Sequence, residues 1–312
     1  MICAEPKSVA ARAMVSRSVP ARERAVTARA ALADCHFCAH HCGVNRLAGE
    51  TGLCHAGDAT RFFMAQTEVT DELDLIPTFA VALSGCDMRC DFCITGAESW
   101  NSRAGKSFYA VEMATKAKEA LRAGARTIMV LGGEPTIHLP AALEFVSHLP
   151  DDARLVWKTN AHGSAQAREL LDGMFDVWLA DFKFGNDNCA RRLAKIPDYT
   201  SVVRENLLWF AGVSCPVGVQ ALACANDTLK RELQRGELIV RHLLMPGHVE
   251  CCWMPVAEWL AAELPGVKVN LRSGFWPAWK SARYPELRGV VSGNETRRAW
   301  QIAENHGLNL IP

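Results

Sequence analysis

The sequence has 312 residues, of which 49% are hydrophobic and 22% are charged, and its 34 Lys and Arg residues balance 34 Asp and Glu residues. This length and composition predict a globular chain with one large buried core, with or without a small appendage. The neutral balance and the lack of a long basic run argue against general binding to nucleic acid or anionic lipid. Because there is no apolar run of about eighteen residues and no secretory signal pattern, we expect a cytoplasmic protein that does not enter a membrane.

Residues 1–30 form an N-terminal extension that the sequence leaves unassigned. Residues 8–30 are rich in Arg and Ala and poor in acidic residues, as in an organelle-targeting peptide, although a helix is the favoured interpretation.

Thirteen cysteines, an odd number with two short-spaced groups, favour metal ligation in a reducing compartment over disulfide bonds. Six cysteines fall outside the two groups and are interpreted as small buried hydrophobic residues. They are Cys3, Cys189, Cys215, Cys224, Cys251 and Cys252.

Residues 31–77 are predicted to form a cysteine-rich metal-binding module. Cys35, Cys38, Cys42 and Cys54 have the spacing C-x2-C-x3-C-x11-C, in a segment with little hydrophobic periodicity. Four thiolates at this spacing can close a tetrahedral zinc site or bind an additional iron–sulfur cluster. The residues leave both metals open: a zinc ion would hold the module together, whereas a second cluster could relay electrons or bind a substrate.

Residues 78–312 alternate between short β-rich runs and amphipathic helical stretches, which predicts βα units that build a parallel sheet. In such folds the functional groups gather at the carboxyl ends of the strands. Six strands are predicted within residues 78–86, 126–133, 154–160, 176–184, 237–247 and 267–275. Helices are predicted within residues 111–125, 141–149, 165–175, 202–212 and 256–264.

Three cysteines directly follow the first of these strands. Cys86, Cys90 and Cys93 have the spacing C-x3-C-x2-C, and the residues just downstream offer Glu98 but no further thiol. A four-iron cluster held by three thiolates keeps one iron open, whereas an electron-transfer cluster normally takes four ligands. The motif therefore predicts a cluster that can bind a substrate.

This motif, with Phe92 directly before its last cysteine, resembles that of the radical S-adenosylmethionine (SAM) enzymes. The segment Gly132, Gly133, Glu134, Pro135 after the second strand is similar to the one that holds the methionyl amino group of SAM in these enzymes. Two glycines let the backbone approach a ligand closely, and Glu134 can accept a hydrogen bond from an ammonium group. Further segments, such as "DVWLADFKFG" and "IVRHLLMPGHVE", resemble an uncharacterised branch related to pyruvate formate-lyase activating enzyme.

The resemblance implies an α/β fold, a partial (β/α)6 barrel with the small N-terminal cysteine-rich metal module, and a [4Fe–4S] cluster on Cys86, Cys90 and Cys93. It also implies that Asp181 and Lys183 lie beside SAM and the substrate as catalytic residues. Arg241 would approach the SAM carboxylate, and Asn160 would lie near the ribose or the methionyl part.

The implied function is reductive cleavage of SAM to a 5′-deoxyadenosyl radical, which abstracts a hydrogen from a small metabolite or from a glycyl residue of a partner protein. The metabolite is favoured because the cysteine-rich module and the residues Ile94 and Thr95 depart from a plain activating enzyme. A flavodoxin- or ferredoxin-type protein is the expected reductant. Two alternatives stay open: transfer of an aminocarboxypropyl or methyl group from SAM, and a non-enzymatic iron–sulfur or zinc protein.

Side chains outside these motifs are interpreted more simply. His138 and His242 are expected to be packing or hydrogen-bonding residues. Phe275, Trp276 and Trp279 lie in an aromatic segment that we expect near the mouth of the barrel, where packing is the favoured role and stacking on a substrate the alternative.

Overall fold

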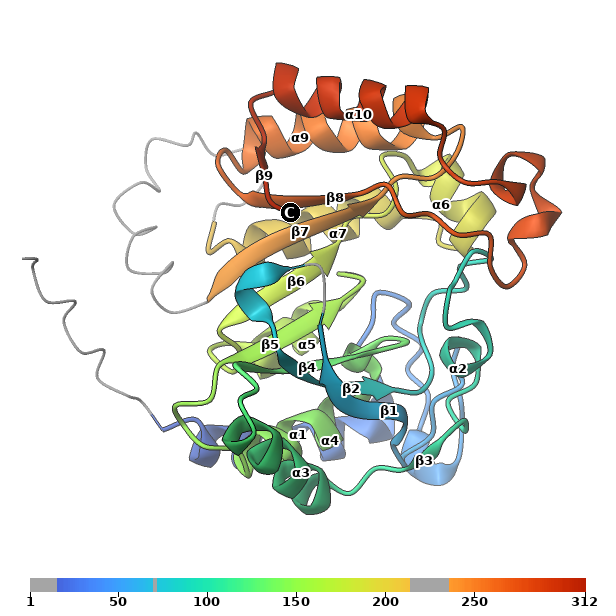
Figure 1. Ribbon diagram of the computed structural model, residues 1–312. Coiled ribbons are helices and arrows are strands. Elements are labelled where there is room, and N and C mark those ends of the chain that lie inside the picture. Colours follow the sequence, from blue (N-terminus) through green and yellow to red (C-terminus); the bar gives the residue numbers. More distant parts are fainter. Residues whose placement is uncertain (1–15, 70–71, 214–235) are drawn as a thin grey trace, which may run out of the picture.

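The computed structural model describes residues 16–69, 72–213 and 236–312 (Figure 1). Cys3, Cys215 and Cys224, together with the first half of the N-terminal extension, lie outside the described residues. In the part that is described, no helix is long and apolar enough to cross a membrane.

The described strands form one sheet in the order β3-β1-β2-β4-β5-β6-β7-β8-β9. From β2 to β9 neighbouring strands are parallel, whereas β1 pairs antiparallel with both β2 and β3. The strands are β1 (Arg61–Glu68), β2 (Thr78–Leu83), β3 (Lys106–Ser107), β4 (Thr127–Gly132), β5 (Leu155–Thr159), β6 (Val177–Asp181), β7 (Glu237–Leu243), β8 (Lys268–Arg272) and β9 (Asn309–Leu310).

The six predicted strands are all present, as β2, β4, β5, β6, β7 and β8, and each pairs with the next in chain order. Helices connect them on the outside of the sheet, with α1, α3 and α4 along one end and α9 and α10 along the other (Figure 1). The α/β fold with a parallel sheet, expected as a partial (β/α)6 barrel, is therefore confirmed. The helices are α1 (Ser18–Ala31), α2 (Gly96–Trp100), α3 (Ala110–Arg122), α4 (Leu139–Ser147), α5 (Ala165–Leu171), α6 (Asp187–Ala194), α7 (Tyr199–Phe210), α9 (Met254–Glu263) and α10 (Gly293–Asn305).

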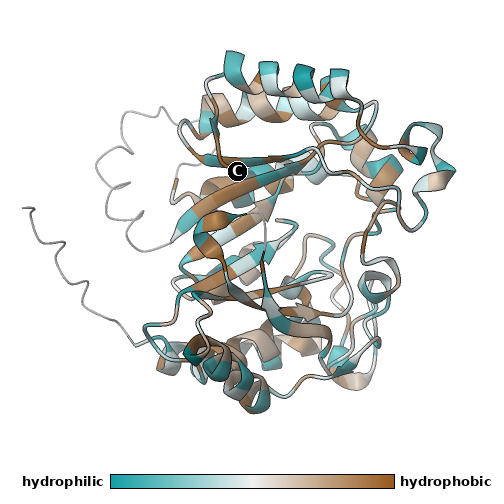
Figure 2. Cartoon of the chain, in the orientation of Figure 1, coloured by the Kyte–Doolittle hydropathy of each residue, from teal (hydrophilic) through white to brown (hydrophobic). Residues whose placement is uncertain are grey.

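The central strands are apolar because both faces of the sheet are covered. Every residue of β2 is buried, and Figure 2 shows brown strands between helices whose outer faces are teal. Parallel strands that are buried on both faces read as continuous hydrophobic runs. Met129, Val156, Leu179 and Ile239 from successive strands form a separate buried cluster with Leu75, apart from the larger core that the helices cover.

Of two elements near the N-terminus, helix α1 agrees with the helix favoured for residues 8–30, whereas strand β1 was not predicted. Helix α1 packs on α4, but the residues it buries are only Ala21 and Ala28, so its amphipathic pattern is weak. Strand β1 extends the main sheet, and the range 31–77 expected for the cysteine-rich module thus contains a strand of that sheet.

Candidate functional site

The loop with the three cysteines leaves β2 and runs across the carboxyl ends of the strands. Cys86 and Cys90 are buried, and Cys93 is partly exposed. Helix α6 holds the loop: the backbone N–H of Arg89 donates to the carbonyl of Ala194 at 3.0 Å, and that of Asp91 to Leu193 at 2.9 Å. Helix α6 therefore helps to fix the conformation of the loop that carries the three thiols.

A cavity of about 470 Å³ opens next to this loop. It brings together residues of the cysteine loop and of the ends of β1, β4, β5, β6, β7 and β8. Of the residues predicted for the site, it is lined by Cys90, Phe92, Cys93, Gly132, Asp181, Lys183 and Arg241. Lys158, Arg272, Phe275 and Trp276, which were not assigned to the site, line it too.

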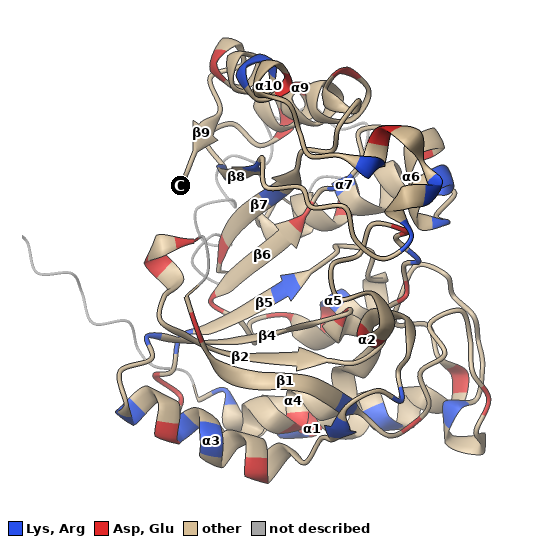
Figure 3. Cartoon of the chain, turned by 45° about the vertical axis from the view of Figure 1, so that its right-hand side comes forward, with Lys and Arg blue, Asp and Glu red and all other residues tan. Residues whose placement is uncertain are grey.

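The charged groups of this cavity form a connected network. Asp181 and Arg241 are register partners on β6 and β7, and Asp181 forms an ion pair with Lys183. Arg241 Nη1 lies 3.7 Å from Asp181 Oδ1, and its Nε lies 2.9 Å from Oε1 of the buried Glu72. Figure 3 shows blue and red segments on β5, β6 and β7, which are otherwise mostly tan.

Burial and neighbouring charges set the protonation of this network. Burial alone would raise the pKa of Asp181, but Lys183 and Arg241 outweigh it and lower the pKa to about 2. Burial, followed by the charge of Arg241, lowers the pKa of Lys158 to about 8. At neutral pH the cavity thus holds an ionised carboxylate and a lysine that titrates within reach of ordinary assay conditions.

The Gly132–Pro135 segment lies against the start of the cysteine loop. A Cβ on Gly133 would stand 1.9 Å from the carbonyl oxygen of Gly85, so only glycine fits. The backbone N–H of Gly133 donates to Leu83 O, and that of Glu134 to Gly85 O, both at 2.9 Å.

Glu134 and Pro135 lie behind the cavity rather than in its lining. The Glu134 carboxylate is buried and accepts hydrogen bonds from the Thr136 hydroxyl at 2.5 Å, the Thr159 hydroxyl at 2.8 Å and the Asn160 backbone at 2.7 Å. Burial, followed by the charge of Asp87, raises its pKa to about 7. Pro135 begins a short 3₁₀ helix.

Asn160 belongs to a buried network that was not predicted. Its side-chain Nδ2 donates to Asp87 Oδ1 at 2.7 Å and lies 3.7 Å from the Cys86 sulfur. Asp87 Oδ2 lies 2.7 Å from His162 Nδ1, and the Asp87 carbonyl lies 3.0 Å from His40 Nε2. Burial would raise the pKa of Asp87, but the contacts with His162 outweigh it and lower it. The network links the cysteine loop to β5 and to the N-terminal module.

The N-terminal module packs on the same edge of the sheet. Cys38 forms a backbone bridge with Gly163, and Arg46 Nη1 donates to the carbonyl of Ile137 at 2.8 Å. Cys38 and Cys54 are buried, and Cys35 and Cys42 are partly exposed. A single metal ion favours ligand atoms that lie within about 4.8 Å of one another. The four cysteines of the module do not bring three sulfurs that close together; they are Cys35, Cys38, Cys42 and Cys54.

The histidines and aromatic residues outside the motifs differ in how far they match the packing role that the sequence predicted. His138 and His242 are buried and face backbone carbonyls, as expected for packing residues: His138 Nε2 lies 2.7 Å from Ser84 O, and His242 Nδ1 lies 2.6 Å from Phe182 O. Phe275 is buried against Phe92, whereas Trp276 is 70% exposed at the cavity.

The interpretation of Cys189, Cys251 and Cys252 as small buried hydrophobic residues is confirmed for Cys252, which lies in the core, and was wrong for Cys251, which is exposed; Cys189 is partly exposed. The three sulfurs lie together with a ring nitrogen of His248. Cys189 stands 59 to 63 positions before the other three, so no local spacing indicates the group.

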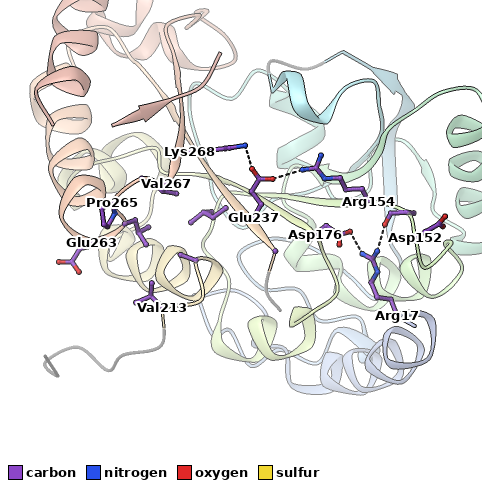
Figure 4. Close-up of a pocket in the computed structure, with 16 residues that line it drawn as sticks. Arg17, Asp152, Arg154, Asp176, Val213, Glu237, Glu263, Pro265, Val267 and Lys268 are labelled. Atoms are coloured by element: carbon purple, nitrogen blue, oxygen red, sulfur yellow. Dashed lines mark hydrogen bonds and ion pairs between the residues drawn. The ribbon is translucent and has the colours of Figure 1, made fainter. Parts of the chain in front are cut away.

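A larger cavity, of about 900 Å³, lies at the opposite, amino ends of the strands (Figure 4). Five of its charged residues pair with one another: Arg17 with Asp176 at 2.7 Å, Arg154 with Glu237 at 3.0 Å, and Lys268 with Glu237 at 2.7 Å. Because parallel α/β folds bind ligands at the carboxyl ends of their strands, the smaller cavity beside the cysteines is the candidate site.

Comparison with protein families decides what this arrangement is. The family model described as Radical SAM superfamily matches residues 81–222, which begin within β2 and include the three cysteines and the Gly132–Pro135 segment. Residues 81–222 therefore form a radical SAM domain. Such a domain implies a [4Fe–4S] cluster and SAM.

The chain is also similar to individual proteins. "Uncharacterized protein MJ0674" of Methanocaldococcus jannaschii is 29% identical over 290 residues, which make up 89% of this chain and 76% of that protein. Two crystal structures of Streptococcus suis SuiB, one bound to the precursor peptide SuiA and one to S-adenosylmethionine, match with a TM-score of 0.50 at 14% identity. They cover 72% of this chain, which spans only 46% and 47% of those chains, and they show the fold alone.

The residues of this chain fit the cofactors of a radical SAM protein. Three cysteines lie in one loop without a fourth thiol in that loop, and two of them face the cavity. Burial raises the pKa of Cys86 and raises that of Cys90 to about 12, so these thiols stay neutral until a metal displaces the proton.

Proposed function

We propose that this radical SAM enzyme holds a [4Fe–4S] cluster through Cys86, Cys90 and Cys93, cleaves SAM reductively in the cavity beside them, and abstracts a hydrogen atom from a small metabolite. The observation that carries the proposal is the cavity itself. It joins Cys90 and Cys93 to the charged ends of neighbouring strands, with Asp181, Lys183 and Arg241 within one network.

The side chains of this network would hold and orient SAM and the substrate. Arg241, fixed by the buried Glu72, is placed to bind the SAM carboxylate. Asp181 stays ionised and orients Lys183 and Arg241, so neither cation depends on the ligand for its position. The backbone of Gly132 lines the cavity and can accept a hydrogen bond from the methionyl ammonium.

The remaining lining would keep water and other hydrogen donors away from the reaction. Phe92 and Phe275 form a buried aromatic wall beside Cys90 and Cys93, and Trp276 stands at the exposed side. When bound, the cluster would supply one electron to the sulfonium of SAM, so that the 5′ carbon–sulfur bond breaks to give methionine and the 5′-deoxyadenosyl radical. The contribution of the protein is to aim that radical at one hydrogen.

The cavity favours a small acidic substrate. A volume of about 470 Å³ lies in the range of small-molecule sites. Four cationic side chains line it, those of Lys158, Lys183, Arg241 and Arg272, against the two carboxylates of Glu68 and Asp181. The cationic excess suits a substrate with a carboxylate or phosphate group.

A glycyl residue of a partner protein is the second substrate class of the same reaction. SuiB, whose fold this chain shares, was solved with a precursor peptide, which supports a macromolecular substrate as the alternative. A flavodoxin- or ferredoxin-type protein would supply the electron in either case.

The test is anaerobic reconstitution with iron and sulfide, addition of SAM and dithionite, and identification of the nucleoside products by mass spectrometry. The proposal predicts 5′-deoxyadenosine that disappears in the Cys86, Cys90 and Cys93 variants. Methylthioadenosine or S-adenosylhomocysteine would indicate group transfer instead. A protein that binds a cluster but neither binds nor cleaves SAM would be an iron–sulfur protein without this activity.

A further inference from the structure

Four potential metal ligands meet outside the candidate site, on the loops that follow β6 and β7. Cys189 lies in α6, whereas His248, Cys251 and Cys252 lie in and just before the π-helical turn Val249–Trp253. All four ligand atoms lie within 4.8 Å of one another. His248 and Cys252 are buried, Cys189 is partly exposed and Cys251 is exposed.

The distances within this group match one tetrahedral zinc ion. His248 Nδ1 lies 3.6 Å from the sulfur of Cys189, 3.2 Å from that of Cys251 and 3.7 Å from that of Cys252. The Cys251 sulfur lies 3.9 Å from each of the other two sulfurs. Zn–S and Zn–N bonds of about 2.3 and 2.0 Å at tetrahedral angles place two sulfurs about 3.8 Å apart and a sulfur and a nitrogen about 3.5 Å apart.

We propose that Cys189, His248, Cys251 and Cys252 bind one structural zinc ion. Three thiolates and one imidazole are a common ligand set for structural zinc. A [4Fe–4S] cluster would hold its thiolates farther apart, because each binds a different iron. The proposal rests on this geometry alone and does not depend on the proposed function.

The surroundings of the group support ligation. Asn186 Nδ2 lies 3.3 Å from the Cys189 sulfur and 3.9 Å from the Cys252 sulfur, so an amide can donate to both thiolates. Ligation through Nδ1 leaves the proton of His248 on Nε2, and the Glu286 carboxylate oxygen Oε1 lies 3.7 Å from that nitrogen. Glu286 is in turn paired with Arg192 at 2.5 Å, and Arg192 also lies 3.3 Å from Nε2. Outer carboxylates of this kind orient zinc-bound histidines.

The backbone is shaped to bring the ligands together. His248, Cys251 and Cys252 stand three and four residues apart on one helical turn, so they share a face. The Cys252 N–H donates to the His248 carbonyl at 3.0 Å. A Cβ on Gly185 would stand 2.3 Å from the Cys252 carbonyl oxygen, so a glycine lets the chain after β6 approach this turn. Single π-helical turns are frequent at functional positions.

The ion would fix α6 to the turn after β7. The last carbonyls of α6, those of Leu193 and Ala194, hold the cysteine loop through Asp91 and Arg89. None of the four zinc ligands lines the cavity, and four protein ligands leave no open coordination position. The role of the ion is therefore to stabilise the support of the cysteine loop.

Zinc analysis of the full chain, purified anaerobically, tests the proposal. The protein with Cys38→Ser and Cys54→Ser serves as parent, so that the N-terminal module does not contribute zinc. We expect about one zinc per chain in this parent, loss of that zinc on adding Cys251→Ser, and its retention with Cys251→His, which keeps a ligand. A zinc content that Cys251→Ser does not change, or a loss of iron in place of zinc, overturns the proposal.

X-ray absorption at the zinc edge of the same parent decides the matter even if the serine variant does not fold. The expected first shell holds three sulfurs at about 2.3 Å and one nitrogen at about 2.0 Å. A shell of four sulfurs, a shell of oxygens, or a parent without zinc contradicts the proposed site.

Discussion

Replacing Gly133 by Ala tests the packing between the Gly132–Pro135 segment and the cysteine loop. The added Cβ would stand 1.9 Å from the Gly85 oxygen, 2.6 Å from its carbonyl carbon and 3.2 Å from the Cys86 nitrogen. All three are backbone atoms that cannot rotate away. To reach an ordinary contact of 3.4 Å, the two segments must separate by about 1.5 Å, the difference between 3.4 and 1.9 Å.

The separation of the two segments has a cost in the free energy of unfolding. Overpacking costs about 1–3 kcal/mol. The hydrogen bond from the Glu134 N–H to Gly85 O, 2.9 Å long, would break as well, which adds about 1 kcal/mol. We expect the free energy of unfolding to fall by about 2–4 kcal/mol. At about 2 °C per kcal/mol, this corresponds to a fall in Tm of about 4–8 °C. Because the shift reaches Cys86, SAM affinity should fall with it.

The assay is thermal unfolding of the anaerobic, cluster-loaded protein, with SAM binding measured on the same samples. Gly289→Ala is the matched control, since Gly289 has a φ of −118° and no atom within 4 Å of the added Cβ. The control should change stability by less than about 1 kcal/mol. If Gly133→Ala unfolds within a degree of the control and binds SAM as tightly as the unchanged protein, the steric argument is wrong.

Three further predictions concern the metal sites and the cavity. Cys90→Ala should abolish SAM cleavage in the nucleoside assay, and normal turnover by this variant would end the cluster assignment. Cys38→Ala should lower the metal content or stability of the N-terminal module, measured by elemental analysis and thermal unfolding; an unchanged metal content would refute metal binding there. Lys158 is cationic below its pKa of about 8 and neutral above it, so anion affinity should fall by about tenfold, or about 1.4 kcal/mol, as pH rises through 8. Lys158→Arg should remove this fall in binding titrations of sulfate, an anion whose charge does not change near pH 8, and an identical fall in both proteins would assign it to another group.

The six parallel strands and the cysteine loop were predictable from the sequence for a physical reason. Strands covered on both faces read as apolar runs, and polar residues directly after them mark the edge where functional groups meet. Cys90, Asp181 and Arg241 line one cavity because neighbouring parallel strands end at one level, as the pairing of Asp181 with Arg241 shows.

Other features depend on tertiary contacts that have no local pattern. The amphipathic pattern of α1 is too weak to predict that the helix packs on α4. Asp87 and His162 meet across 75 residues, and Cys189 meets His248 across 59, so neither pair forms a recognisable motif. Lys158 reads as an ordinary strand residue, and only the closed sheet places it in the cavity.

Electron paramagnetic resonance of the dithionite-reduced protein, with and without SAM, tests the central claim most directly. The protein with Cys38→Ser and Cys54→Ser is used, so that a cluster in the N-terminal module cannot contribute. The account predicts the signal of a reduced [4Fe–4S] cluster whose g values shift when SAM is added, because SAM binds the open iron. A cluster signal that SAM leaves unchanged, or a signal that survives replacement of Cys86, Cys90 and Cys93, would contradict it.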